Sequence, residues 1–167
     1  MIVNVTLTGG KELIANFKSM APAIHAALLK KVTTLALKLE RHVKVDKLNG
    51  QVLNRISGAL ARSIHSKVEQ IATAVSGIVF SSGDVKYARI HEYGGTTSPH
   101  IIEPKKASVL AFAGAGGMIF AKRVNHPGSK IPERSFLRSS LHDMSTEISL
   151  GMKQAIVEAM QKKVNGK

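Results

Sequence analysis

The densest cluster of potentially reactive residues lies between Tyr87 and Gly95. It reads Tyr-Ala-Arg-Ile-His-Glu-Tyr-Gly-Gly and contains both tyrosines of the chain beside His91 and Glu92. A His-Glu pair also occurs in the zinc-binding helix of metalloproteases, where a second histidine must follow four residues after the first, on the same helix face. The corresponding position here is Gly95, which cannot bind a metal. The sequence therefore excludes this zinc-protease site.

A looser metal site could be formed by His91, His100 and His126 with Glu92 or Glu103. Their spacing matches no typical set of metal ligands, so we expect these side chains to hydrogen-bond to loop backbone instead. A metal-dependent hydrolase that uses His91, Glu92 and His126 is kept as a third hypothesis.

Other signals of catalysis are weak. There is no cysteine, which rules out thiolate chemistry, and no Gly-x-Ser-x-Gly elbow. The glycine-rich stretch from Gly114 to Gly117 is followed by strand-like residues, not by Lys-Ser/Thr and a helix, so it indicates a hairpin turn and not a phosphate loop. We expect no catalytic, cofactor-binding or metal-binding residues, and no enzyme.

The chain carries a net charge of +13, from 24 basic and 11 acidic residues. Such an excess favours polyanions or acidic proteins as neighbours, although it also serves general solubility. With five Phe, two Tyr and no Trp, the sequence lacks the aromatic platforms of a single-strand binder. The candidate contacts for DNA or an acidic partner are Arg62, Lys67, Lys105, Lys106, Lys122, Arg123 and Lys130.

The length of 167 residues suits a single domain, and no apolar run is long enough to span a bilayer. The first ten residues alternate like a strand and lack the features of a signal peptide. We therefore expect a soluble protein, made in a cytoplasm, with no membrane partner.

Apolar periodicity gives the order of elements. Two long stripes with steps of three and four residues predict the helices, and runs of period two predict the strands. Pro22 should divide the first helical region into a short helix near 10–19 and a longer one from Ala21 to Val45. The expected segments are an N-terminal strand or arm (1–9), helices (10–45), β-hairpins (58–124), a C-terminal helix (133–163) and a tail (164–167). This order predicts an α+β fold, with an antiparallel sheet of about four strands packed against the N-terminal and C-terminal helices.

Several motifs follow one another in a recognisable order after residue 57. They are Gly58-Ala-Leu-Ala-Arg-Ser-Ile64, the stretch Tyr87–Gly95, Ile102-Glu-Pro104 and a Leu-x-Phe strand at Leu110 and Phe112, then His126-Pro-Gly128 running into Ile131-Pro-Glu-Arg-Ser-Phe-Leu-Arg138. In this order the motifs resemble those of the tail-completion, or head–tail joining, proteins of long-tailed bacteriophages, also called phage virion morphogenesis proteins.

The resemblance implies a structural role without catalysis. Proteins of this family form a ring, often sixfold, where the tail tube meets the head, and DNA passes through its lumen without sequence-specific contacts. The implied partners are further copies of the chain, tail-tube proteins, head-connector proteins and phage DNA. The protein would be assembled in the host cytoplasm and reside in the virion as a tail-completion, terminator or neck protein. A non-specific DNA-binding protein with a basic surface is the alternative.

Under this interpretation the first cluster is a structural corner and assembly contact. We expect Tyr87 to anchor it with a buried ring, and we expect Glu92 to pair with Arg134 or Arg138. The glycines allow a sharp turn into a contact loop. The residues assigned to this assembly or structural motif are Tyr87, Ala88, His91, Glu92, Tyr93, Gly94, Gly95, His126, Pro127, Gly128, Pro132, Arg134, Phe136 and Leu137.

Overall fold

The computed structural model describes residues 10–71, 74–83 and 85–165, with side chains from Lys18 onward. Within this range the chain is 50% helical and 25% strand, which confirms the α+β class. The strand expected over residues 2–8 lies outside the described residues. The chain divides into two compact units: unit 1 is Met1–Val85 with Phe136–Lys167, and unit 2 is Lys86–Ser135. The single domain expected over residues 1–167 stays a prediction.

Helix α1 runs unbroken from Gly10 to His42, so the expected break at Pro22 was wrong. A proline inside a helix costs about 3 kcal/mol, but it removes only one backbone hydrogen bond. Burial of apolar side chains such as Val32 and Leu35 on the same helix outweighs this cost. The helix continues as a wider π-helical segment, η1 (Val43–Gln51), past the expected end at Val45, and Asn49 and Gly50 within it leave helical geometry.

An antiparallel hairpin of β1 (Ile64–Ile71) and β2 (Ala74–Ser81) follows, as expected. The first residues of the predicted strand instead form a short helix, α2 (Ala59–Ser63). This helix starts at Gly58, whose φ of +73° is left-handed, and the backbone N–H of Arg62 donates to the Gly58 carbonyl. Gly77 lets β2 approach α1 closely, because a Cβ there would lie 3.0 Å from Val32 Cγ1.

The C-terminal helix expected over residues 133–163 is two helices, α4 (Leu137–Asp143) and α5 (Ser145–Asn165). Met144 separates them with φ −92° and ψ 0°, and the Ser145 hydroxyl donates to the His142 carbonyl. The helical region begins four residues later than expected and extends into the predicted tail. A serine hydroxyl that bonds to the preceding turn competes with continuous helix, and apolar periodicity cannot detect this.

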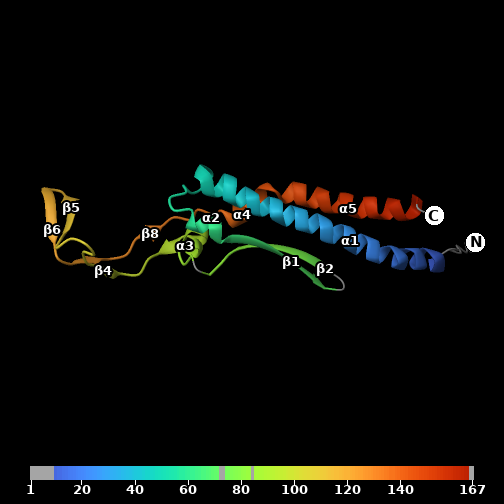
Figure 1. Ribbon diagram of the computed structural model, residues 1–167, viewed down its shortest axis with the longest axis horizontal. Coiled ribbons are helices and arrows are strands. Elements are labelled where there is room, and N and C mark those ends of the chain that lie inside the picture. Colours follow the sequence, from blue (N-terminus) through green and yellow to red (C-terminus); the bar gives the residue numbers. More distant parts are fainter. Residues whose placement is uncertain (1–9, 72–73, 84, 166–167) are drawn as a thin grey trace, which may run out of the picture. The chain divides into compact units, whose positions relative to one another are not determined.

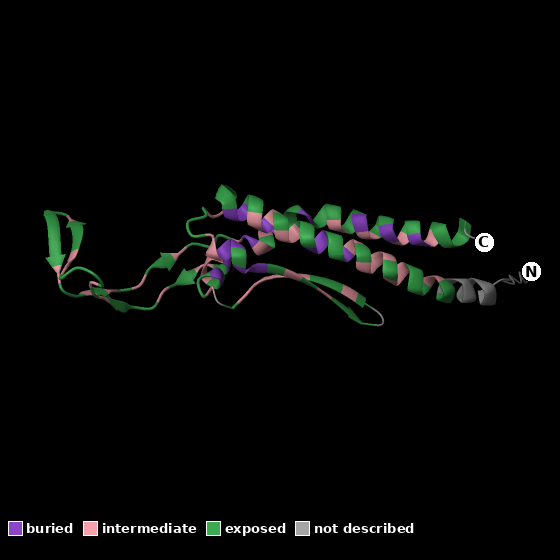
Figure 2. Ribbon diagram, in the orientation of Figure 1, coloured by how far each residue is buried: buried purple, intermediate pink, exposed green. Residues whose placement is uncertain are grey.

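The core of unit 1 lies around α1. The β1–β2 hairpin contacts α1 on one side, and α5 packs along α1 on the other (Figure 1). The largest fully buried side chains are Phe136, Ile64 and Val43, which come from distant parts of the sequence. The buried positions follow the facing sides of α1 and α5 (Figure 2).

Unit 2 contains the short helix α3 (Ala88–Tyr93) and six strands in three antiparallel pairs. The strands are β3 (Gly95–Thr96), β4 (His100–Ile102), β5 (Leu110–Gly114), β6 (Gly117–Ala121), β7 (Val124–His126) and β8 (Lys130–Ile131). The pairs are β3–β8, β4–β7 and β5–β6. With β1–β2, the structure therefore has four two-stranded pairs, where one sheet of about four strands was expected.

The three pairs of unit 2 are nested, so that residues 95–131 form one antiparallel excursion, here called the β-arm. Gly95 faces Ile131 near its base, and Gly114 faces Gly117 at its tip. The pairs β3–β8 and β4–β7 keep one continuous register. Beyond them, seven residues (103–109) connect β4 to β5, whereas only two (122–123) connect β6 to β7. This unequal loop interrupts the ladder and sets the β5–β6 hairpin apart. The glycine-rich stretch is the hairpin turn that the sequence predicts.

Candidate functional site

The corner at the start of unit 2 is built around the C-terminus of α3. Ala88 and Glu92 are buried, and the Ser135 hydroxyl donates to Glu92 Oε1 at 2.7 Å. The backbone N–H of Arg134 donates to the His91 carbonyl at 2.7 Å. The structure therefore brings the motif at 87–95 together with the residues that close unit 2. An ion pair of Glu92 with Arg134 or Arg138 stays a prediction.

Two glycines make this junction possible. Gly94 has φ +69°, and a Cβ there would lie 2.9 Å from the backbone nitrogen of Glu133. Gly128 has φ +94°, and a Cβ there would overlap the carbonyl oxygen of Thr97. Both positions combine left-handed backbone with contact to a neighbouring chain segment, which only glycine tolerates. The sharp turn predicted at Gly94 is thus confirmed, and Gly128 holds the facing strand end in the same way.

The aromatic residues of the motif do not form the anchor that the sequence suggests. Tyr87 is 43% exposed, so the expected burial of its ring was wrong; the ring contacts His91 edge-on, with centroids 5.9 Å apart. Tyr93 is 61% exposed. On so short a helix, the small side chain of Ala88 occupies the buried position instead.

Of the three histidines considered as metal ligands, His100 and His126 contact loop backbone instead. His126 Nδ1 accepts from the Gly128 N–H at 3.0 Å, and His100 Nδ1 lies 3.1 Å from the Ser98 carbonyl. These two rings face each other across β4 and β7 and stack at 4.9 Å. The Nδ1 atom of His91, by contrast, is buried without a hydrogen-bond partner in the described part of the chain. Among the described residues, no group of three or more His, Asp or Glu side chains is arranged to hold a metal.

The remaining motif residues divide between the two units. Pro127 and Pro132 are exposed in the β-arm and its return, where their fixed φ suits extended chain. Phe136 is fully buried in unit 1, and Leu137 is the first residue of α4. Phe136 therefore contributes to the core of unit 1, and its position in the motif reflects packing.

The basic candidates also divide between the units. Arg62 and Lys67 belong to unit 1, where Arg62 Nη1 donates to the Ser57 carbonyl and Lys67 pairs with Glu69. The other five are exposed in unit 2, and within its described residues none of them forms an ion pair. Lys105 and Lys106 precede the β5–β6 hairpin, and Lys122 and Arg123 follow it directly.

The hairpin between these cations is the feature that the search for reactive residues missed. Phe112 faces Ile119 on one side of the hairpin, and Met118 and Phe120 lie on the other, because successive strand residues alternate between faces. Their side chains are 39%, 45%, 60% and 66% exposed, respectively, and no charged residue occurs between Lys106 and Lys122 (Figure 2). The sequence signal was this charge-free run between two pairs of cations.

A polar cluster in unit 1 holds η1 against the end of α4. Lys47 is 5% exposed, and its ammonium group lies 2.6 Å from Asp143 Oδ2. His42 contacts Asp46 and Asp143 through its two ring nitrogens. Hydrogen bonding from Lys47, supported by His42, holds the pKa of the Asp143 carboxyl below its ordinary value despite partial desolvation. Desolvation would raise the pKa of Glu40, but hydrogen bonds from Lys44 and Ser66 outweigh it and lower that pKa.

No protein-family model, curated protein or solved structure matches this chain. Within the part of the chain that the structure describes, no helix is both long enough and apolar enough to cross a membrane.

Proposed function

We propose that this protein is a structural, non-enzymatic virion component of a tailed bacteriophage at the head–tail junction, where copies assemble as a ring around the DNA channel. The ordered motifs and the charge of +13 support this role. The observation that carries the assembly part of the proposal is the exposed, apolar β5–β6 hairpin of unit 2.

This hairpin lacks what an isolated hairpin needs for stability in water. A two-stranded ribbon is marginal unless a third strand or a helix covers it. Both faces carry large apolar side chains, and both outer edges are unpaired among the described strands. Exposed edges and faces of this kind are suited to pairing with another chain.

The exposed surface is large enough to matter in a ring. Taking about 200 Å² for each fully exposed large side chain, the four apolar residues expose roughly 400 Å². That is about half of the roughly 800 Å² that each partner gives to a standard interface. The hairpin would therefore supply about half of one subunit's share of a standard interface, and other surfaces of the subunit would supply the rest.

Assembly would also provide the larger sheet that a single chain does not form. When the free edges of two copies pair, two-stranded ribbons combine into a four-stranded antiparallel sheet. The sheet of about four strands expected from the sequence would then belong to the oligomer. Its packing against the long helices is part of the same proposal.

The test compares the wild-type protein with Ile119→Asp/Phe120→Asp by mass photometry and negative-stain electron microscopy. We expect wild-type rings with a central channel, either alone or with tail-tube or connector proteins, and monomers for the variant. Leu150→Asp/Val157→Asp is the matched control, because it places the same charges at two exposed apolar positions on α5. Monomers of the wild-type protein under every condition, or equal dissociation of both variants, would refute ring assembly through the hairpin.

The second candidate function is sequence-independent DNA binding without a virion role. The exposed cations Lys105, Lys106, Lys122, Arg123 and Lys130, none of which is paired in the described part of unit 2, favour it. Binding through phosphates alone should weaken with salt at a slope of about −0.9 per phosphate contacted. Fluorescence anisotropy with a labelled duplex at several salt concentrations measures this slope, and absence of binding at low salt excludes the candidate.

A further inference from the structure

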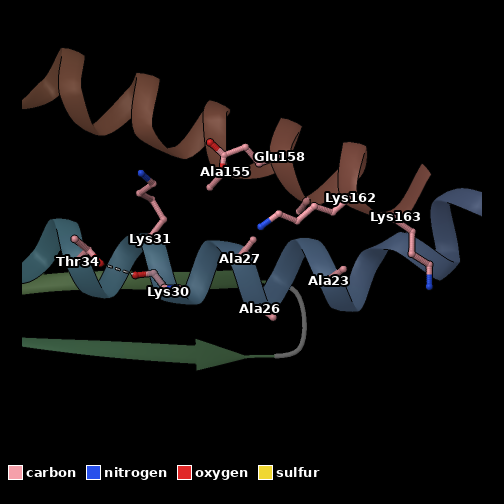
Figure 3. Close-up of a pocket in the computed structure, with 11 residues that line it drawn as sticks. Ala23, Ala26, Ala27, Lys30, Lys31, Thr34, Ala155, Glu158, Lys162 and Lys163 are labelled. Atoms are coloured by element: carbon pink, nitrogen blue, oxygen red, sulfur yellow. Dashed lines mark hydrogen bonds between the residues drawn. The ribbon is translucent and has the colours of Figure 1, made fainter. Parts of the chain in front are cut away.

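A groove of about 620 Å³ lies between α1 and α5 in unit 1. Alanines from both helices line it, among them Ala26 on α1 and Ala159 on α5. Figure 3 shows the side chain of Lys31 extending from α1 toward α5, and that of Lys162 extending from α5 toward α1. The groove thus has small side chains and lysine side chains in its lining.

The charge in this groove is unbalanced. Lys30, Lys31, Lys162 and Lys163 line it with a single acid, Glu158, and no ion pair involves any of these five residues within the described part of the chain. Four like charges around one groove repel one another unless an anion lies between them.

The other end of the same helix pair is different. There Lys38 of α1 pairs with Glu147 of α5, and Lys47 of η1 pairs with Asp143 of α4. Lys44 pairs with Glu40 one turn away. The lysines at that end are therefore neutralised by acids, whereas the four lysines of the groove are not.

We propose that this groove binds an acidic amphipathic helix from a different protein. Small side chains on facing helices permit close approach, and helix axes pack about 8–10 Å apart. The α1 residues that line the groove span positions 23–34, which corresponds to roughly 17 Å at about 1.5 Å per residue. A partner helix of about three turns fills this length, with its small apolar residues on the alanines and its carboxylates beside the lysines.

The chemistry of the chain excludes a second copy as the occupant. Helix α1 has only Glu12 and Glu40 as acidic residues, and α5 has only Glu147 and Glu158. Neither helix can present an acidic face, and two copies would bring lysines against lysines. A DNA duplex is too wide to enter a groove between two packed helices, and it would leave the alanine walls uncovered.

The test uses an acidic amphipathic peptide of about 18 residues, which is long enough to form a helix on its own. It is acetylated and amidated, with Ala and Leu on one face and Glu on the other, and its binding is measured by isothermal titration calorimetry at low salt. Lys31→Gln/Lys162→Gln should weaken binding by about tenfold, the loss expected for two partly screened ion pairs. Lys18→Gln/Lys153→Gln, with the same net charge but exposed lysines outside the groove, should stay within about twofold.

A second variant tests the walls of the groove and not its charge. Ala23 is exposed on α1 and lines the groove, so Ala23→Phe should fold normally and fill the groove. It should weaken binding of the peptide by about tenfold or more while leaving the binding of a DNA duplex unchanged. Far-UV circular dichroism and the thermal midpoint establish that each variant is folded.

Three results would overturn the proposal: no saturable binding of the peptide, equal losses for the two lysine pairs, or equal binding of a scrambled peptide of the same composition. If Lys31→Gln/Lys162→Gln loses DNA binding and Ala23→Phe leaves peptide binding unchanged, the groove lysines belong to a surface for polyanions and not to a helix-binding groove. The inference does not depend on the proposed virion role. Mass photometry of Lys31→Gln/Lys162→Gln should give the wild-type oligomer. Failure of the groove to bind the peptide can therefore be distinguished from failure of the chain to form a ring.

Discussion

The two units of this chain differ in how they use apolar side chains. Unit 1 buries Val43, Ile64 and Phe136 completely, between two long helices and a hairpin. The structure describes every residue of unit 2, from Lys86 to Ser135, and only Ala88 and Glu92 among them are buried. Four of its large apolar side chains, Phe112, Met118, Ile119 and Phe120, lie instead on the exposed hairpin. Unit 1 thus has a core of its own, whereas unit 2 relies on hydrogen bonds, glycine-dependent close contacts and, in our proposal, other copies.

The same amino acid therefore has opposite roles in the two units, and a pair of phenylalanines tests this directly. Phe136→Ala removes a fully buried ring from unit 1 and should lower the free energy of unfolding by about 3–5 kcal/mol. Phe120→Ala, at a side chain that is 66% exposed, should change it by less than about 0.5 kcal/mol in dilute protein. Urea denaturation followed by circular dichroism measures both. Similar losses for the two variants would mean that the units do not differ in this way.

A glycine substitution should loosen unit 2 alone. Gly128→Ala forces a side chain into left-handed backbone against the Thr97 carbonyl, at a cost of about 1–3 kcal/mol or more. Hydrogen exchange should accelerate in the β-arm and stay unchanged in α1 and α5. Gly116→Ala is the control, since its Cβ would meet nothing within 4 Å and its backbone is not left-handed. Faster exchange in α1 as well would show that unit 1 depends on the arm.

A smaller effect should appear in the acid stability of unit 1. Because the pKa of Asp143 is lowered in the folded protein, the unfolded chain takes up its proton first as the pH falls. The stabilisation is present above the ordinary value of 3.8 and is lost as the pH falls through the folded pKa. The lowered pKa of Glu40 contributes in the same way, because its stabilisation is also lost as the pH falls below 4.5, the ordinary pKa of that carboxyl.

Asp143→Asn should therefore flatten the dependence of the urea midpoint on pH in the acid range, with little change in slope near neutrality. Glu158→Gln, which alters an exposed carboxylate outside any ion pair of the described chain, should retain the wild-type slope. An unchanged acid slope in Asp143→Asn would mean that the contact with Lys47 does not persist in solution.

Much of the fold could be predicted from periodicity, because each long helix buries one face. The stripes through Val32 and Leu35 and through Met152 and Ile156 identified α1 and α5, and alternation identified both large hairpins. The errors lie where a single residue competes with the pattern. Pro22 did not break α1, since the tertiary burial of that helix outweighed the local cost. The helical turn at Ala59–Ser63 and the break at Met144 depend on local hydrogen bonds that leave no periodic signal.

The candidate sites were predicted less completely. The turn at Gly94 follows from residue type, because few residues other than glycine adopt left-handed backbone. The motif could not show that Phe136 packs inward, because residue type and order do not distinguish a core position from an assembly contact. The lysine groove could not be found from sequence, because Lys31 and Lys162 are separated by most of the chain and meet only when α1 and α5 pack.

Unit 1 is discontinuous, with unit 2 inserted between Val85 and Phe136. During synthesis, α1 and the β1–β2 hairpin leave the ribosome well before α5, at roughly 5–20 residues per second. For several seconds their apolar faces lack the helix that covers them, so this interval is when a chaperone has most to protect. Closing the core across the insertion costs little more than closing a shorter loop, because each doubling of loop length adds only about 0.6 kcal/mol. The arm can therefore change in length over evolution with little effect on the helical core, while truncation of the last helix would leave that core unfinished.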